Sequence, residues 1–151
     1  MSSLSAAQRR EIDLAKELLV TKAENLLQSS GVTPGRDFGH SQLRNLVAVA
    51  METESPAVVL NFIRYQMGRD DRKKGWAGPG AGNRRLGDLF VAELHEAGGA
   101  VETALETVQN VKADKVVEQH ARMELIRYFL GFATRYMKYL EMQSDRRGGG
   151  R

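Results

Sequence analysis

Cysteine is missing from the sequence, so disulfide bonds and thiolate metal ligands are excluded. No apolar run approaches the roughly 20 residues that a membrane-spanning helix requires. The opening segment, MSSLSAAQRREIDLAK, carries arginine and glutamate where a secretory signal needs continuous apolar side chains. We therefore expect a cytoplasmic protein with no membrane association.

Groupings of catalytic side chains are also scarce. The three histidines, His40, His95 and His120, are scattered, and neither an HExxH nor an ExxH spacing occurs. There is no GxSxG elbow, and the acidic residues are spread along helix faces opposite basic residues. The glycine-rich segment GWAGPGAGN follows a helix and lacks the GK[ST] ending of a P-loop. These features predict no metal, no cofactor and no enzymatic activity, and a small hydrolase or nuclease is the least favoured function.

The composition is that of a soluble globular domain, with 42% hydrophobic and 27% charged residues among 151. The net charge is only +3, but its distribution is uneven. Six cations and two acids lie between Arg69 and Arg85, so this window has an excess of four positive charges and the rest of the chain sums to −1. A concentrated positive field attracts polyanions, although charged clusters are also common on solvated loops.

Apolar residues recur at helical spacing along almost the whole chain, and no segment alternates as a strand does. The pattern predicts an all-α fold, a compact bundle of five to six helices with a long central C-terminal helix. One helical domain is expected over residues 1–143, with a flexible glycine-rich loop at 70–82 and a disordered basic tail at 144–151. The expected helices cover about residues 5–30, 41–53, 56–67, 83–97, 100–111 and 114–141.

Local signals mark several of these helix starts. Ser5 and Gln8 have the spacing of a capping box, and Ser55 precedes a proline at the first position of the third helix. Asn83 is the expected cap of the fourth helix. Trp76, the only tryptophan, either stacks on a nucleic-acid base or pins the glycine-rich loop to the core.

The last helix has apolar residues over more than half of its circumference, which indicates a central position in the bundle. The narrow remaining face carries three cations, Arg127, Arg135 and Lys138, beside small residues. This stripe is roughly 16 Å long, enough to follow about three phosphates of a nucleic-acid backbone. A solvated helix face is also normally charged, so the stripe alone does not decide between the two interpretations.

Three segments together resemble a known family. SQLRN (41–45) opens one helix, IRYQMGR (63–69) closes the next, and RYFLGFATRYMKYLE (127–141) lies in the last. In this order they resemble the small helical subunit of type III-A CRISPR interference complexes, over about two-thirds of the chain. Met137 precedes Lys138 where the family motif has histidine.

The resemblance implies a non-catalytic subunit of a type III ribonucleoprotein that binds the backbone of guide and target RNA without sequence specificity. Its expected partners are the other effector subunits and stacked copies of itself. The candidate RNA-binding residues, from the motifs and the basic cluster, are Arg44, Arg64, Arg69, Arg127, Arg135, Lys138, Lys73 and Lys74. The alternative is a helical adaptor whose basic residues bind an acidic protein partner.

Overall fold

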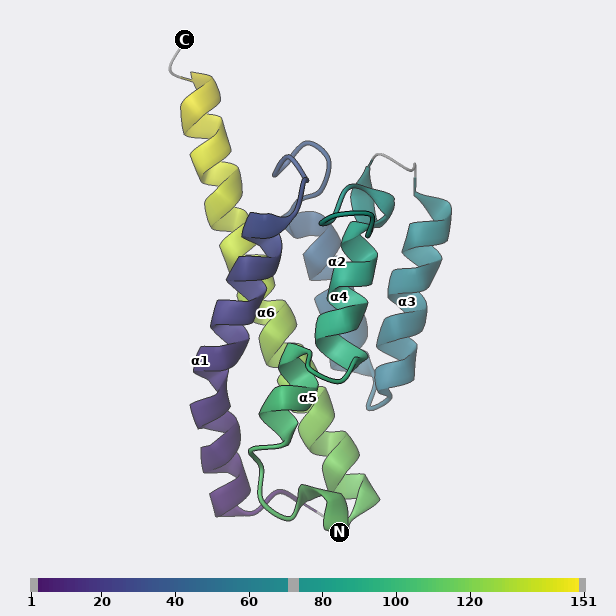
Figure 1. Cartoon of the computed structure of the whole chain (residues 1–151), viewed down its shortest axis with the longest axis vertical. Coiled ribbons are helices and arrows are strands. Elements are labelled where there is room, and N and C mark those ends of the chain that lie inside the picture. The colour runs from purple at the N-terminus through teal and green to yellow at the C-terminus, as the bar shows by residue number, and fades with distance from the viewer. Residues whose placement is uncertain (1–2, 71–73, 150–151) are drawn as a thin grey trace.

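Helices provide the regular structure of the computed structural model, apart from two isolated β-bridges (Figure 1). The structure describes residues 3–70 and 74–149, with side chains as far as Arg146. In chain order the helices are α1 (Ala6–Ser29), α2 (His40–Glu52), α3 (Pro56–Arg69), the 3-10 turn η1 (Gly75–Ala77), α4 (Leu86–His95), α5 (Ala100–Leu105), the 3-10 turn η2 (Val111–Ala113) and α6 (Lys115–Gly149). The prediction of an all-α bundle with a long C-terminal helix is confirmed.

Helix α6 is the central element of the bundle. It packs along α1 on one side and along α2 and α5 on others, whereas α3 and α4 lie farther from it (Figure 1). Its buried residues include Met123, Phe129 and Met137, each with no exposed side-chain surface. The wide apolar arc of the last helix therefore has the central position that the sequence predicts.

Hydrogen bonds at the helix starts explain where α1 and α4 begin. The Gln8 N–H donates to Ser5 Oγ (3.1 Å) and the Ser5 N–H donates to Gln8 Oε1 (2.9 Å), so the predicted capping box is confirmed. The expected cap at Asn83 is wrong, because α4 begins at Leu86, where the Arg85 N–H donates to Asp88 Oδ2 (3.1 Å). A hydrogen bond from the Gly80 N–H to the Arg84 carbonyl (3.0 Å) holds Asn83 in a turn instead.

The glycine-rich loop differs from the flexible connector that the sequence predicts. Residues 75–78 are buried, and Trp76 is only 1% exposed. Its ring makes edge contacts with Phe38, at 4.7 Å between ring centroids, and with Phe90, at 5.2 Å. Of the two interpretations of Trp76, pinning its loop to the core is confirmed, because a buried ring has no face free for a base. Residues 71–73, including Lys73, lie outside the described part of the chain.

The C-terminal segment also differs from the prediction. The chain was expected to leave the helix near residue 143, but α6 continues to Gly149 and extends past the body of the bundle (Figure 1). No proline interrupts the sequence after residue 115, and each residue added to an existing helix closes one further hydrogen bond. The helix can therefore continue into solvent without tertiary contacts.

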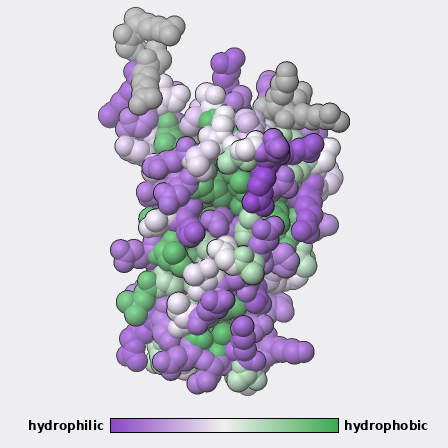
Figure 2. Space-filling view, viewed as in Figure 1, coloured by the Kyte–Doolittle hydropathy of each residue, from purple (hydrophilic) through white to green (hydrophobic). Residues whose placement is uncertain are grey.

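Hydrophilic side chains cover most of the face shown in Figure 2, with separate apolar patches between them. In the described part of the chain, no helix combines the length and the apolar character needed to cross a membrane.

Candidate functional site

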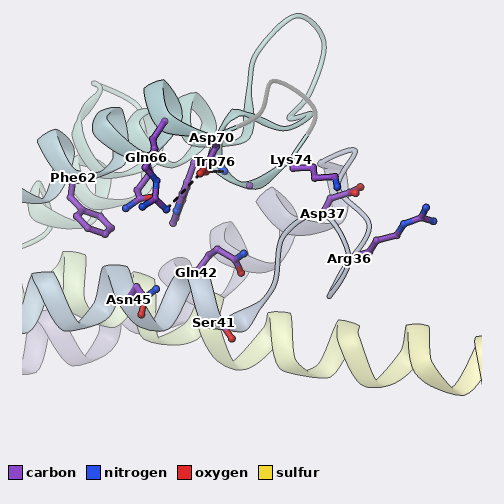
Figure 3. Close-up of a pocket in the computed structure, with 12 residues that line it drawn as sticks. Arg36, Asp37, Ser41, Gln42, Asn45, Phe62, Gln66, Asp70, Lys74 and Trp76 are labelled. Carbon is purple, nitrogen blue, oxygen red and sulfur yellow. Dashed lines mark hydrogen bonds and ion pairs between the residues drawn. The ribbon is translucent and has the colours of Figure 1, made fainter.

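A cleft of about 440 Å³ opens between the first half of α2 and the second half of α3 (Figure 3). Residues of the connector between α1 and α2, and of the segment that enters η1, complete its lining. The cleft therefore brings together two stretches that are far apart in sequence, and its lining combines polar side chains with aromatic rings.

The end of the cleft near η1 is held by specific backbone contacts. The Gly75 N–H donates to the Asp37 carbonyl (2.7 Å), and the Trp76 N–H donates to Asp70 Oδ2 (2.9 Å). Gly75 has a φ of +60°, and a Cβ at this position would collide with the Asp70 carboxylate. This junction therefore favours glycine and ties the α1–α2 connector to the end of α3.

Three cations from three different segments line the cleft: Arg36, Arg69 and Lys74. Arg69 is 62% exposed and lies 4.0 Å from Asp70 Oδ1, the limit of an ion pair. Arg36 and Lys74 form no ion pair with any described residue. These groups are available to an external anion.

The two carboxylates of the cleft oppose these cations only in part. Asp37 Oδ2 accepts a hydrogen bond from the Thr33 N–H (3.1 Å), and Asp70 Oδ2 accepts one from Trp76. Both carboxylates are therefore engaged in holding the local backbone. The lining carries three positive and two negative side chains, so its net charge is positive.

Neutral polar groups and one aromatic ring line the rest of the cleft. Gln42 accepts a hydrogen bond from the Gly39 N–H through Oε1 (3.0 Å). In the described part of the chain, the side-chain amides of Asn45 and Gln66 have no hydrogen-bond partner within the protein. Phe62 is half-buried and its ring points from α3 toward α2 (Figure 3). The cleft thus offers both charged and neutral contacts.

Of the predicted RNA-binding residues on α3, only Arg69 lines the cleft. Arg64 is also exposed, but it precedes Arg69 by five residues, which corresponds to about 140° around the helix. Arg69 lies on the side of α3 that carries Phe62 and Gln66 and faces α2, so Arg64 points away from the cleft. The two arginines do not share one surface.

Arg127 requires a correction, because it is not part of an exposed stripe. Its side chain is 19% exposed, and its guanidinium donates to the carbonyls of Ala50 (2.9 Å) and Thr53 (2.8 Å) and to Glu54 Oε1 (2.9 Å). The carbonyls at a helix end lack hydrogen-bond donors within the helix, and here Arg127 donates to them. The bond from Arg127 also holds the pKa of Glu54 below its usual value. Arg127 thus caps the C-terminal end of α2.

Two exposed cations lie together at the opposite end of the α2–α6 contact. There Glu141 accepts hydrogen bonds from the His40 N–H (3.0 Å) and pairs with His40 Nδ1 (2.7 Å). With Arg127 holding the far end of α2, the two helices are antiparallel. Arg44 and Lys138 each lie about one turn inward from the His40–Glu141 pair, on the same faces, and both are exposed.

Arg135 is exposed and precedes Lys138 by three residues, so the two cations are neighbours on the surface of α6. Arg135 lines a shallow groove between α1 and α6, together with Val20, Phe132 and Tyr139. The predicted cations of the described chain are therefore divided among the cleft, the α2–α6 face with the adjoining α1–α6 groove, and the outer side of α3. They do not form a single continuous track.

Sequence reasoning missed Arg36 and the amide side chains of the cleft. Arg36 lies in the connector GVTPGRDFGH, well before the basic window that begins at Arg69. The connection between them is the hydrogen bond from Gly75 to Asp37, which is a tertiary contact. The only local signal is the aromatic Phe38 between polar residues, which indicates a buried anchor next to Arg36.

Within the described ranges, no three or more His, Asp or Glu side chains come together in a way that suits a metal ion. No protein-family model, no curated protein and no solved structure matches this chain. The functional assignment therefore depends on the motifs and on the geometry of the cleft.

Proposed function

We propose that this protein binds the sugar-phosphate backbone of RNA, without catalysing a reaction, as the small subunit of a type III CRISPR ribonucleoprotein complex. The observation that carries the RNA-binding part is the cleft, which Arg36, Arg69 and Lys74 line without strong ion pairs to described residues. The CRISPR assignment rests on the three sequence motifs alone. In this proposal the partners of the protein are guide and target RNA, other effector subunits and further copies of the chain.

The chemistry of the cleft suits a phosphate ligand. A guanidinium group presents paired donors that match two phosphate oxygens, and an ammonium adds a mobile charge. Such contacts position a nucleic acid but carry no information about its bases, which a protein serving many guide sequences requires. Arg44 and Lys138 provide a second point of attachment on the neighbouring α2–α6 face.

The test compares two double variants that remove the same charge. Arg69→Gln with Lys74→Gln changes the cleft, whereas Arg10→Gln with Lys112→Gln changes exposed cations at the start of α1 and in η2, at the other end of the bundle (Figure 1). Fluorescence anisotropy with a labelled RNA at low salt is expected to show about tenfold weaker binding for the cleft variant and little change for the control. Melting temperatures of both variants should stay close to that of the parent, because all four side chains are exposed.

Unchanged RNA affinity of the cleft variant, both for the free protein and within the assembled complex, would reject the proposed function. The assembled complex is included because a single copy makes few phosphate contacts and several copies add theirs together.

The free end of α6 favours a second candidate, a helical adaptor for an acidic protein. There Tyr139 (52% exposed) and Met142 (50% exposed) lie near the exposed Arg135, a combination that suits a protein interface. Purification from cells under native conditions separates the two functions. Nuclease-sensitive association with a high 260/280 absorbance ratio supports RNA binding, and a nucleic-acid-free complex with an acidic protein supports the adaptor.

A further inference from the structure

The cleft is lined by aromatic and amide groups in addition to the cations that would bind a phosphate. Phe62, Gln66 and Arg69 follow one another at helical spacing along the side of α3 that faces α2. Asn45 lies across from them on α2 (Figure 3). Phe62 and Asn45 occupy one end of the cleft, and Lys74 and Arg36 occupy the other (Figure 3). The lining therefore changes from aromatic and amide groups to cations along its length.

The amide and aromatic end has unused binding capacity. Asn45 and Gln66 each present a donor and an acceptor, and neither side-chain amide is bonded within the described part of the protein. The Phe62 ring is half-buried and lines the open space. A phosphate can accept a hydrogen bond from an amide N–H but offers nothing to an aromatic ring, whereas a nucleobase has a flat face for the ring and polar edges for the amides.

The dimensions also suit a ligand of that size. The cleft holds about 440 Å³, which is within the range of roughly 300–1,000 Å³ that small-molecule sites occupy. From Phe62 to Arg69 the helix rises about 10 Å, so a base at one end leaves its own phosphate near the cations at the other. Trp76 forms part of the wall but is 1% exposed, so Phe62 is the ring available for stacking.

We propose that the cleft binds one nucleotide of single-stranded RNA that is turned out of its stack. The base lies against Phe62 between Asn45 and Gln66, and the phosphate lies at Arg69 and Lys74, with Arg36 at the rim. This inference rests on the proposed function, because the same cations hold the backbone. It adds that the ligand is an unpaired strand, since the bases of a duplex are stacked and paired and do not reach the cleft.

This arrangement is compatible with sequence-independent binding. A side-chain amide can turn its donor or its acceptor toward the ligand, so each of the four bases finds a complementary edge. Stacking on an aromatic ring also tolerates every base. The cleft thus distinguishes single strands from duplexes without distinguishing one sequence from another.

The experiment measures the affinity of a fluorescein-labelled 12-nucleotide RNA, alone and annealed to its complement, by anisotropy. Two cleft variants are compared, Phe62→Leu and the double variant Asn45→Ala with Gln66→Ala. The matched controls are Phe132→Leu, a half-buried phenylalanine of the α1–α6 groove, and Asn61→Ala, an exposed amide outside the cleft lining. We expect each cleft variant to bind the single strand about fivefold or more weakly, with duplex binding unchanged and both controls like the parent.

A second readout uses the protein's own fluorophore. Trp76 is the only tryptophan and borders the cleft, so its emission is expected to shift on titration with adenosine monophosphate and to shift less with inorganic phosphate. In the variant Asn45→Ala with Gln66→Ala, the emission shift with adenosine monophosphate should fall to the size of the shift with inorganic phosphate. Because Asn45 is exposed and Gln66 is only half-buried, this variant still carries the test if Phe62→Leu impairs folding.

The outcomes separate this inference from the proposed function. If Arg69→Gln with Lys74→Gln weakens both RNA forms while the Phe62 and amide variants change neither, the nucleotide site is rejected and backbone binding stands. If the cleft aromatic and amide variants weaken single-strand binding and the cation variant does not, base binding in the cleft stands, whereas the phosphate position at Arg69 and Lys74 and the proposed backbone binding are rejected. If no cleft variant alters the binding of either RNA form, both are rejected.

Discussion

Arginine has two different roles in this protein, which depend on the surroundings of the side chain, as Arg127 and Arg69 show. Arg127 is enclosed by the end of α2 and uses its donors on two carbonyls and a carboxylate of the same protein. Arg69 extends from the end of α3, is 62% exposed, and among the described residues its one ion-pair partner is Asp70, at 4.0 Å. The first stabilises the fold, and the second remains available to an external ligand.

Replacing Arg127 with alanine is expected to destabilise the protein by about 2–3 kcal/mol, because the Ala50 carbonyl of α2, the Thr53 carbonyl just after it and Glu54 lose a charged donor. Urea denaturation measures the loss of unfolding free energy. The control is Arg135→Ala, at an exposed position of the same helix, which should remain within about 0.5 kcal/mol of the parent. Equal effects of the two substitutions would contradict the structural role of Arg127.

At the scale of elements, η1 joins the cleft to the core. Trp76 contacts Phe38 and Phe90, and Phe90 in turn contacts Phe129 of α6, with 6.1 Å between the ring centroids. The Leu86 N–H donates to the Gly78 carbonyl (2.9 Å), which connects η1 to the start of α4. The wall of the cleft is therefore supported by the same aromatic cluster that stabilises the bundle.

Trp76→Ala should lower the unfolding free energy by about 3–5 kcal/mol, since it leaves a large cavity beneath the cleft. Trp76→Phe keeps one ring in the cluster and should lose less. Chemical denaturation followed by far-ultraviolet circular dichroism provides the measurement, since the signal does not depend on the tryptophan. A loss below about 1 kcal/mol for the alanine variant would indicate that the loop is not part of the core.

Helix α4 contains a half-buried carboxylate with a perturbed pKa, Glu93, which contacts the first residue of α5. Burial raises the pKa of Glu93 above its usual value of 4.5, against the opposing effects of Lys22 and of a hydrogen bond from the Ala100 N–H (3.3 Å). The folded protein thus favours the protonated form. The stability that this group contributes is present at low pH and is lost as the pH rises through its folded pKa.

Glu93→Gln should therefore raise the melting temperature at neutral pH, because glutamine keeps the acceptor for Ala100 and removes the partly desolvated charge. The gain should shrink as the pH falls below the folded pKa of Glu93. Melting curves over roughly pH 4 to 8 measure the difference, with the exposed Glu106→Gln as control. A gain that is independent of pH would contradict this assignment.

At the scale of the whole molecule, the cations are distributed over several faces of one bundle. The cleft contributes three, and the α2–α6 face adds Arg44 and Lys138. One copy therefore makes few contacts with a polyanion, and the proposed repetition of copies along an RNA would add them together. The free protein is expected to bind RNA weakly.

The salt dependence of binding counts the phosphates that one copy neutralises. With the three cations of the cleft and the two of the α2–α6 face engaged, the logarithm of the affinity for single-stranded RNA should fall with the logarithm of salt concentration with a slope of about −3.5. Arg69→Gln with Lys74→Gln should reduce this slope by about 1.4, as measured by anisotropy at several potassium chloride concentrations. A slope that the double variant leaves unchanged would place the RNA contacts elsewhere on the protein.

Much of the fold was predictable because its signals are local. The apolar stripe of the last helix, the Ser5–Gln8 capping box and the proline at the start of α3 each act within a few residues, and each appears in the structure as predicted. The candidate site was less predictable. Arg69 was identified from its motif and from the basic cluster, and Lys74 from the cluster alone. The other residues of the cleft come from a segment that composition does not connect to them.

The amino-acid order by itself determined that this chain forms helices, where most of them begin and which of their faces are apolar, because hydrogen bonds within helices and side-chain spacing act over short distances. Only the tertiary structure decided which charged and polar groups meet. Arg127 donates to carbonyls more than 70 residues away, and Asp37 accepts from Gly75 across the cleft. Such contacts depend on how whole helices pack, which is why Arg127 caps the end of α2 and Arg69 remains exposed.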